Sequence, residues 1–118
     1  MIDGAHLIIY SNDAEADRAF FRDVLRYPHV DAGHGWLIFK LPPAELAVHP
    51  ADGGGGGSHE VFFMCADLAA TVAELASQGV EFTQEVTQAG WGAVTAFRLP
   101  GGSEVRLYEP RHPRATEL

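Results

Sequence analysis

The strongest constraint on the fold is an internal repeat, in which an ionisable residue opens an apolar run and an aspartate follows seven positions later. Residues 6–13 read HLIIYSND, and residues 60–67 read EVFFMCAD. Short apolar runs bounded by polar residues are typical of buried strands, and an aspartate that precedes a helical pattern is a preferred helix cap. The sequence therefore predicts two copies of one unit, each beginning with a strand that leads into a capped helix.

Each predicted helix is followed by short β-prone runs that Gly and Pro turns separate. In the first copy we expect strand 5–10, helix 13–25 and strands 29–31, 36–41 and 45–49. In the second copy we expect strand 60–65, a helix from Asp67 to near Gly79, and strands 85–87, 94–99 and 105–109. The repeat predicts an α+β fold of two βαβββ modules in one domain: module one 5–50, a Gly-rich connector 51–58 and module two 59–113.

Composition narrows the class of partner. The 118 residues carry 8 Lys and Arg against 16 Asp and Glu, a formal net charge of −8. This acidic balance argues against a nucleic acid or an anionic membrane as partner, and favours a small molecule. Cys65 is the only cysteine, so no intrachain disulfide can form. With no basic leader and no long apolar run, we expect a soluble cytoplasmic protein.

The doubled βαβββ order, the helices capped at Asp13 and Asp67, and the closing segment 98–110 resemble the vicinal oxygen chelate superfamily. That superfamily includes glyoxalases, bleomycin-resistance proteins and extradiol dioxygenases. The resemblance extends from Ala5 to about Pro113. It implies that each module curls into a half-barrel, and that two half-barrels pair into a glyoxalase-like barrel whose cavity often holds a divalent metal.

The resemblance also implies a set of metal ligands on the first and last strands of the modules. The matching positions are His6, His49, Glu60 and Glu109. A glyoxalase I site is similar in using two His and two Glu, but there each module supplies one of each, whereas here module one would supply both His and module two both Glu. Extradiol dioxygenases usually carry His where Glu60 stands. Such a set suits Ni, Zn, Mn, Co or Fe(II), and ligand type alone does not choose among them.

With this resemblance the chain is expected to be a metal-dependent lyase, isomerase or dioxygenase that acts on a small oxygenated metabolite. A bound metal would polarise an oxygen of the substrate while Glu60 or Glu109, the candidate catalytic residues, moves a proton. The alternative from another functional class is a metal-free protein of the bleomycin-resistance kind, which would sequester a small molecule without transforming it.

Strand alternation also predicts the lining of a pocket. Side chains that share a strand face with the candidate ligands, together with the two tryptophans that lie near glycine turns, form this set: Tyr10, Trp36, Phe62, Met64, Trp91 and Leu107. A single pair of half-barrels leaves sheet edges and apolar faces to be covered. We therefore expect a homodimer, with modules that pair within or between chains.

Overall fold

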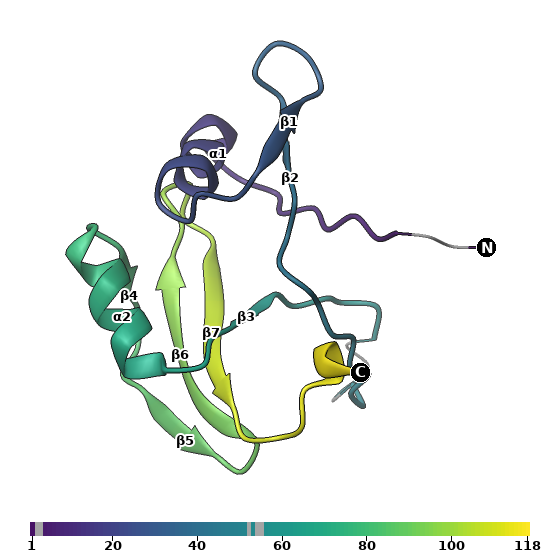
Figure 1. Cartoon of the computed structure of the whole chain (residues 1–118), viewed down its shortest axis with the longest axis vertical. Helices are drawn as coiled ribbons and strands as arrows, with labels where there is room; N and C mark the ends of the chain where they lie inside the picture. Colours follow the sequence, from purple (N-terminus) through teal and green to yellow (C-terminus); the bar gives the residue numbers. More distant parts are fainter. Residues whose placement is uncertain (2–3, 52, 54–55) are drawn as a thin grey trace.

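The structure, a computed structural model, describes residues 1, 4–51, 53 and 56–118. Three residues of the predicted connector, Asp52, Gly54 and Gly55, lie outside the described residues. Within the described part the chain has an α+β fold with a five-stranded sheet, a separate two-stranded sheet and two α-helices (Figure 1). No helix in the described ranges is long and apolar enough to cross a membrane.

Module two has the predicted order of a strand, a helix and further strands, with two differences: strand 81–82 was not predicted, and the strand predicted at 85–87 lies at 87–89. Strand β3 (Phe62–Met64) leads into helix α2 (Leu68–Ser77), and the remaining strands are β4 (Glu81–Phe82), β5 (Thr87–Ala89), β6 (Gly92–Arg98) and β7 (Glu104–Pro110). The sheet order is β3-β7-β6-β4, with β5 also paired to β6, and β3 runs parallel to β7. The predicted cap is confirmed, because the Asp67 carboxylate accepts a hydrogen bond from the Ala70 amide at 3.0 Å.

The core lies between the helices and one face of the sheet. Helix α1 (Ala14–Asp23) lies over the end of the sheet where β6 turns into β7, and α2 runs alongside the strands (Figure 1). Phe97 is 1% exposed, and its ring lies 6.0 Å from that of Phe20 on α1. The buried Asp17 of α1 accepts a hydrogen bond from the Gly101 amide at 2.6 Å. This hydrogen bond joins module one to module two. The two modules therefore share one core.

Module one is formed only in part. Helix α1 is present, capped by Asp13 as predicted, and β1 (His29–Asp31) pairs antiparallel with β2 (Leu37–Phe39). The predicted strands 5–10 and 45–49 are wrong for this chain, because both segments are extended but belong to neither sheet. Figure 1 shows the hairpin of β1 and β2 projecting from the body and the N-terminal end of the chain pointing away from it. The physical reason is that each segment lacks a neighbouring strand to complete its backbone hydrogen bonds.

Strands β6 and β7 approach each other so closely at Gly92 that there is no room for a side chain. A Cβ added at Gly92 would lie 2.4 Å from the backbone oxygen of Glu109, and backbone atoms within a sheet cannot move aside. Replacing Gly92 with Ala is therefore expected to lower the free energy of unfolding by about 2 kcal/mol. Gly90, two residues away in the hairpin turn, has open space at the same position, so Gly90→Ala is the matched control and should cause no loss. Urea denaturation of the two variants measures the difference, and equal stabilities would contradict the predicted clash.

Candidate functional site

Three aromatic rings meet on the sheet face that turns away from the helices. We call Phe62, Trp91 and Tyr108 the aromatic cluster. The Trp91 ring lies 5.2 Å from that of Tyr108 and 6.1 Å from that of Phe62, and the Phe62 and Tyr108 rings lie 5.7 Å apart, all edge to face. Trp91 is 44% exposed and Phe62 36% exposed. These rings therefore offer an accessible apolar surface of fixed geometry, which suits a planar ligand.

An ion pair borders the aromatic cluster. The Arg106 Nε atom donates to Glu60 Oε2 at 3.1 Å, and the Arg106 guanidinium lies 5.7 Å from the centre of the Phe62 ring. Both side chains are exposed to a large extent, so the pair is screened by water and contributes little to stability. Its chemical effect is local: a permanent cation neutralises the carboxylate that the sequence suggested as a metal ligand and general base.

A shallow pocket of about 280 Å³ opens beside this ion pair. Ile8 and Ile9 of the N-terminal segment line one side, and Glu60 and Arg106 line the other. The N-terminal segment is further joined to module two by a hydrogen bond of 3.5 Å from the Ser103 hydroxyl to the Tyr10 carbonyl. Segment 5–10 therefore runs beside the starts of β3 and β7 without pairing to them as a strand.

Tyr108 is joined to a histidine of the C-terminal segment. The Tyr108 hydroxyl lies 3.0 Å from His112 Nε2, and His112 Nδ1 lies 2.8 Å from the Pro113 carbonyl oxygen. Burial, helped by the charge of Glu45, raises the pKa of Tyr108, so this phenol keeps its proton at neutral pH. Neither residue was predicted from the sequence as part of the site. The alternation of Glu104, Arg106 and Tyr108 with apolar neighbours on β7 could have indicated them.

Glu109 has a structural role on the opposite face of β7. Its Oε1 atom accepts a hydrogen bond from the Leu68 amide at 2.9 Å, at the first residue of α2, where the helix dipole favours a carboxylate. Leu107 shares this face and is 3% exposed within the core, so its predicted place in the pocket is wrong. The strand parity was right, but the face that was taken as the cavity is the one that the helices cover.

The other two predicted ligands lie on segments outside both sheets. His6 and His49 are exposed, as are most residues around them. Within the part of the chain that the structure describes, no three His, Cys, Asp or Glu side chains are grouped so that they could hold a metal ion. With Glu60 paired to Arg106 and Glu109 bound to the α2 amide, the four predicted ligands do not fit a divalent metal within one chain.

The remaining predicted pocket residues divide between two places. Met64 lies on the same face of β3 as Phe62, near the aromatic cluster. Trp36 packs instead against Arg18 of α1, whose guanidinium carbon lies 4.5 Å from the centre of the Trp36 ring. Trp36 is 63% exposed. Tyr10 is 88% exposed on the N-terminal segment. Trp36 and Trp91 therefore do not roof one pocket within the chain.

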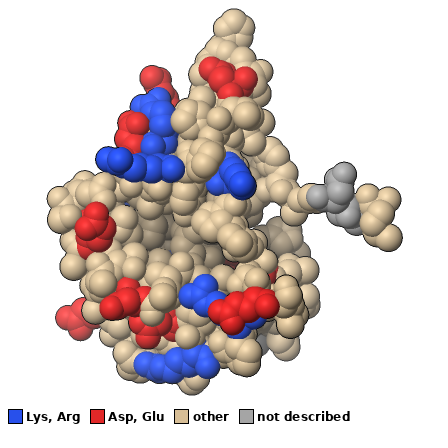
Figure 2. Space-filling model, in the orientation of Figure 1, with Lys and Arg blue, Asp and Glu red and all other residues tan. Residues whose placement is uncertain are grey.

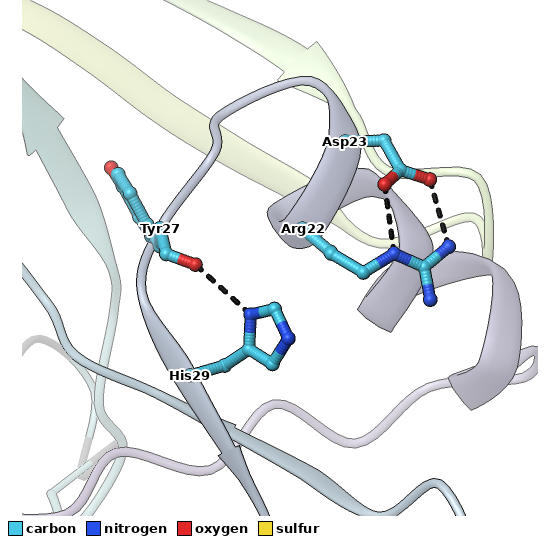
Figure 3. A network of polar contacts seen from close by, with 4 residues as sticks. All are labelled: Arg22, Asp23, Tyr27 and His29. Carbon is cyan, nitrogen blue, oxygen red and sulfur yellow. Dashed lines mark hydrogen bonds and ion pairs between the residues drawn. The ribbon is translucent and has the colours of Figure 1, made fainter.

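The polar contacts at the end of α1 suggest neither a catalytic nor a binding role. At the end of α1 the guanidinium of Arg22 binds the neighbouring Asp23 carboxylate through two nitrogens, at 2.7 and 2.8 Å, and His29 Nδ1 contacts the Tyr27 carbonyl at 3.2 Å (Figure 3). The hydrogen bond from Arg22 lowers the pKa of Asp23, as expected for an exposed pair. On the face drawn in Figure 2, basic and acidic side chains are interspersed.

Comparison with known proteins identifies relatives of the fold. A family model described as the Glyoxalase/Bleomycin resistance protein/Dioxygenase superfamily matches residues 5–107. No curated protein sequence matches the chain. Among solved structures, the antibiotic binding protein TnmS3 from Streptomyces is 21% identical with a TM-score of 0.65, and the match covers 92% of this chain and 97% of TnmS3.

Two further structures show how widely this fold is used. Lactoylglutathione lyase from Agrobacterium tumefaciens is 19% identical with a TM-score of 0.58, and the match covers 86% of this chain and 88% of the lyase. A member of the same superfamily from Sphaerobacter thermophilus is 24% identical with a TM-score of 0.62, covering 92% and 98% of the two chains. At these identities the likeness establishes the fold, and the activities of those proteins belong to them alone.

Proposed function

We propose that this chain, which belongs to the Glyoxalase/Bleomycin resistance protein/Dioxygenase superfamily, binds a planar aromatic small molecule without the help of a metal. The observation that carries the proposal is the aromatic cluster, because three rings in fixed edge-to-face contact present exposed apolar surface beside polar groups. A ligand that stacks on such rings gains apolar burial and aromatic contact without ordering a flexible loop.

The charges around the aromatic cluster support a metal-free site. A metal at Glu60 would have to displace the Arg106 guanidinium, and repulsion between the two cations would weaken its binding. A metal at Glu109 would have to remove the carboxylate from the Leu68 amide, leaving that helix terminus without its acceptor. The relative TnmS3 is described as an antibiotic binding protein, which adds weight to binding without chemistry.

The metal-dependent enzyme remains the second candidate, favoured by the structural likeness to a lactoylglutathione lyase. It requires His6, His49, Glu60 and Glu109 to converge, which within one chain they do not. Metal analysis of protein purified without chelators separates the two proposals: a stoichiometric divalent metal that His6→Ala removes would favour the enzyme over the binding protein.

We further propose that the chain acts as a homodimer. Segments 5–10 and 45–49 carry exposed apolar side chains, with Leu46 92% and Val48 89% exposed. Each segment is extended without belonging to a sheet, so its backbone groups have no ladder of hydrogen bonds. Extended apolar segments of this kind are stabilised by pairing with a second copy, which also covers their side chains.

Binding is tested most directly on the Trp91 indole. In the variant Trp36→Phe, Trp91 is the only tryptophan, so one indole N–H signal in the NMR spectrum reports on the aromatic cluster. Titration with 2-naphthol, a planar aromatic probe, is expected to shift this signal in a saturable way that EDTA does not alter. Phe62→Ala should weaken binding about tenfold through the loss of one aromatic wall.

One control variant and two contrary outcomes complete the binding test. Phe39→Ala, which removes a ring from β2 outside the aromatic cluster, should leave the affinity for 2-naphthol unchanged. An unshifted Trp91 signal at millimolar probe would overturn the proposed function, and so would binding that EDTA abolishes.

A further inference from the structure

The contact between Tyr108 and His112 determines the direction of a hydrogen bond at the proposed ligand site. The Pro113 carbonyl oxygen can only accept, so in the neutral form of the imidazole the 2.8 Å contact places the proton on His112 Nδ1. Nε2 then carries a lone pair and accepts from the Tyr108 hydroxyl 3.0 Å away. The phenolic proton is directed at His112, and the oxygen keeps its lone pairs for another donor.

We propose that Tyr108 selects ligands that carry an O–H or N–H donor on a planar ring, with His112 as the positioning residue that fixes its hydroxyl. This inference rests on the proposed function and names the ligand class of that site. The Tyr108 ring is in edge-to-face contact with both Trp91 and Phe62, so the ligand that the proposed function places on those rings would also meet Tyr108.

The selectivity has a simple physical origin. A ligand donor satisfies the Tyr108 oxygen, whereas an ether at the same place brings two acceptors together and leaves both without a partner. Rotating the hydroxyl toward such a ligand would break its bond to His112. The imidazole is held by its own contact of 2.8 Å to the Pro113 carbonyl oxygen, so following the hydroxyl would break that contact.

A matched pair of probes tests the selectivity. In the Trp36→Phe background, 2-naphthol and 2-methoxynaphthalene are titrated separately while the Trp91 indole signal is followed. We expect 2-naphthol to bind about tenfold more tightly than its methyl ether, the effect of one hydrogen bond. Tyr108→Phe keeps the ring that packs on Trp91 but should bring the two affinities together.

The ratio of the affinities for 2-naphthol and 2-methoxynaphthalene also tests the role of His112. His112→Ala frees the Tyr108 hydroxyl to donate or accept, so the preference should fall to about threefold through improved binding of the ether. A purely structural role for His112 would weaken both probes alike and leave the ratio unchanged. Tyr27→Phe, which removes a hydroxyl outside the aromatic cluster, is the control and should keep the full preference.

The outcomes distinguish this inference from the proposed function beneath it. If both probes shift Trp91 with equal affinity, or if the preference survives in Tyr108→Phe, the donor selection is wrong while aromatic binding stands. If neither probe shifts the Trp91 signal, the proposed function fails and the selectivity fails with it.

Discussion

Replacing Phe97 with Ala is expected to lower the free energy of unfolding by about 4 kcal/mol. Phe97 is 1% exposed, and its ring contacts Phe20 of α1 at 6.0 Å and Phe82 of β4 at 5.8 Å. The substitution removes a large apolar side chain and leaves a cavity where the two modules share their core. Because small domains are stable by only about 5–15 kcal/mol, the variant should unfold at much lower urea concentration.

Phe62→Ala is the matched comparison, because it makes the same chemical change on the opposite face of the sheet. Phe62 is 36% exposed, so its loss should cost about 1 kcal/mol of stability. The same substitution should weaken binding of 2-naphthol about tenfold. Equal losses of stability in the two variants would mean that the face assigned to ligand binding is also part of the core.

Local signals in the sequence predicted the helices and most of module two. Asp13 and Asp67 accept hydrogen bonds from the amides three residues on, and Gly79 adopts φ +87° just beyond α2, where a left-handed cap was expected. These features depend on a few neighbouring residues, which is why single-sequence reasoning finds them. The order of elements in module two follows from the same signals.

The strands of module one could not be predicted in the same way. Segments 5–10 and 45–49 have the composition of strands, but a strand exists only when a neighbour accepts and donates its backbone hydrogen bonds. Which strand lies beside it is a property of the assembled fold, and no pattern within HLIIYS encodes that neighbour. The sequence therefore indicated extended structure correctly and paired structure incorrectly.

Two of the predicted pocket residues, Phe62 and Trp91, lie in the aromatic cluster, whereas the residues predicted on β7 lie on its other face, for a related reason. Strand alternation tells which side chains share a face, but does not tell which face the helices cover. Taking the Glu109 face as the cavity assigned a helix-capping carboxylate to a metal and placed the core residue Leu107 in the pocket. The ion pair of Glu60 with Arg106 could not be predicted either. Arg106 is 46 residues away and contacts Glu60 only because β3 pairs with β7.

Introducing two lysines into the exposed segment, as Leu46→Lys with Val48→Lys, is expected to convert a dimer into a monomer. The two side chains are two residues apart in the segment and are 92% and 89% exposed within one chain. Burying a Leu or Val contributes about 1.5–3 kcal/mol, and two-fold symmetry doubles the effect. A loss of about 6 kcal/mol corresponds to a dissociation constant roughly ten-thousandfold higher.

Light scattering at micromolar concentration measures the change in mass. Val86→Lys, at an exposed valine in the loop between β4 and β5, adds one charge elsewhere and should leave the dimer intact. A wild-type chain that is monomeric under these conditions would refute the proposed dimer. A dimer that survives both lysines would instead move the interface away from segment 45–49. In the monomeric variant, binding of 2-naphthol at Trp91 then shows whether the aromatic cluster of one chain is sufficient for the ligand.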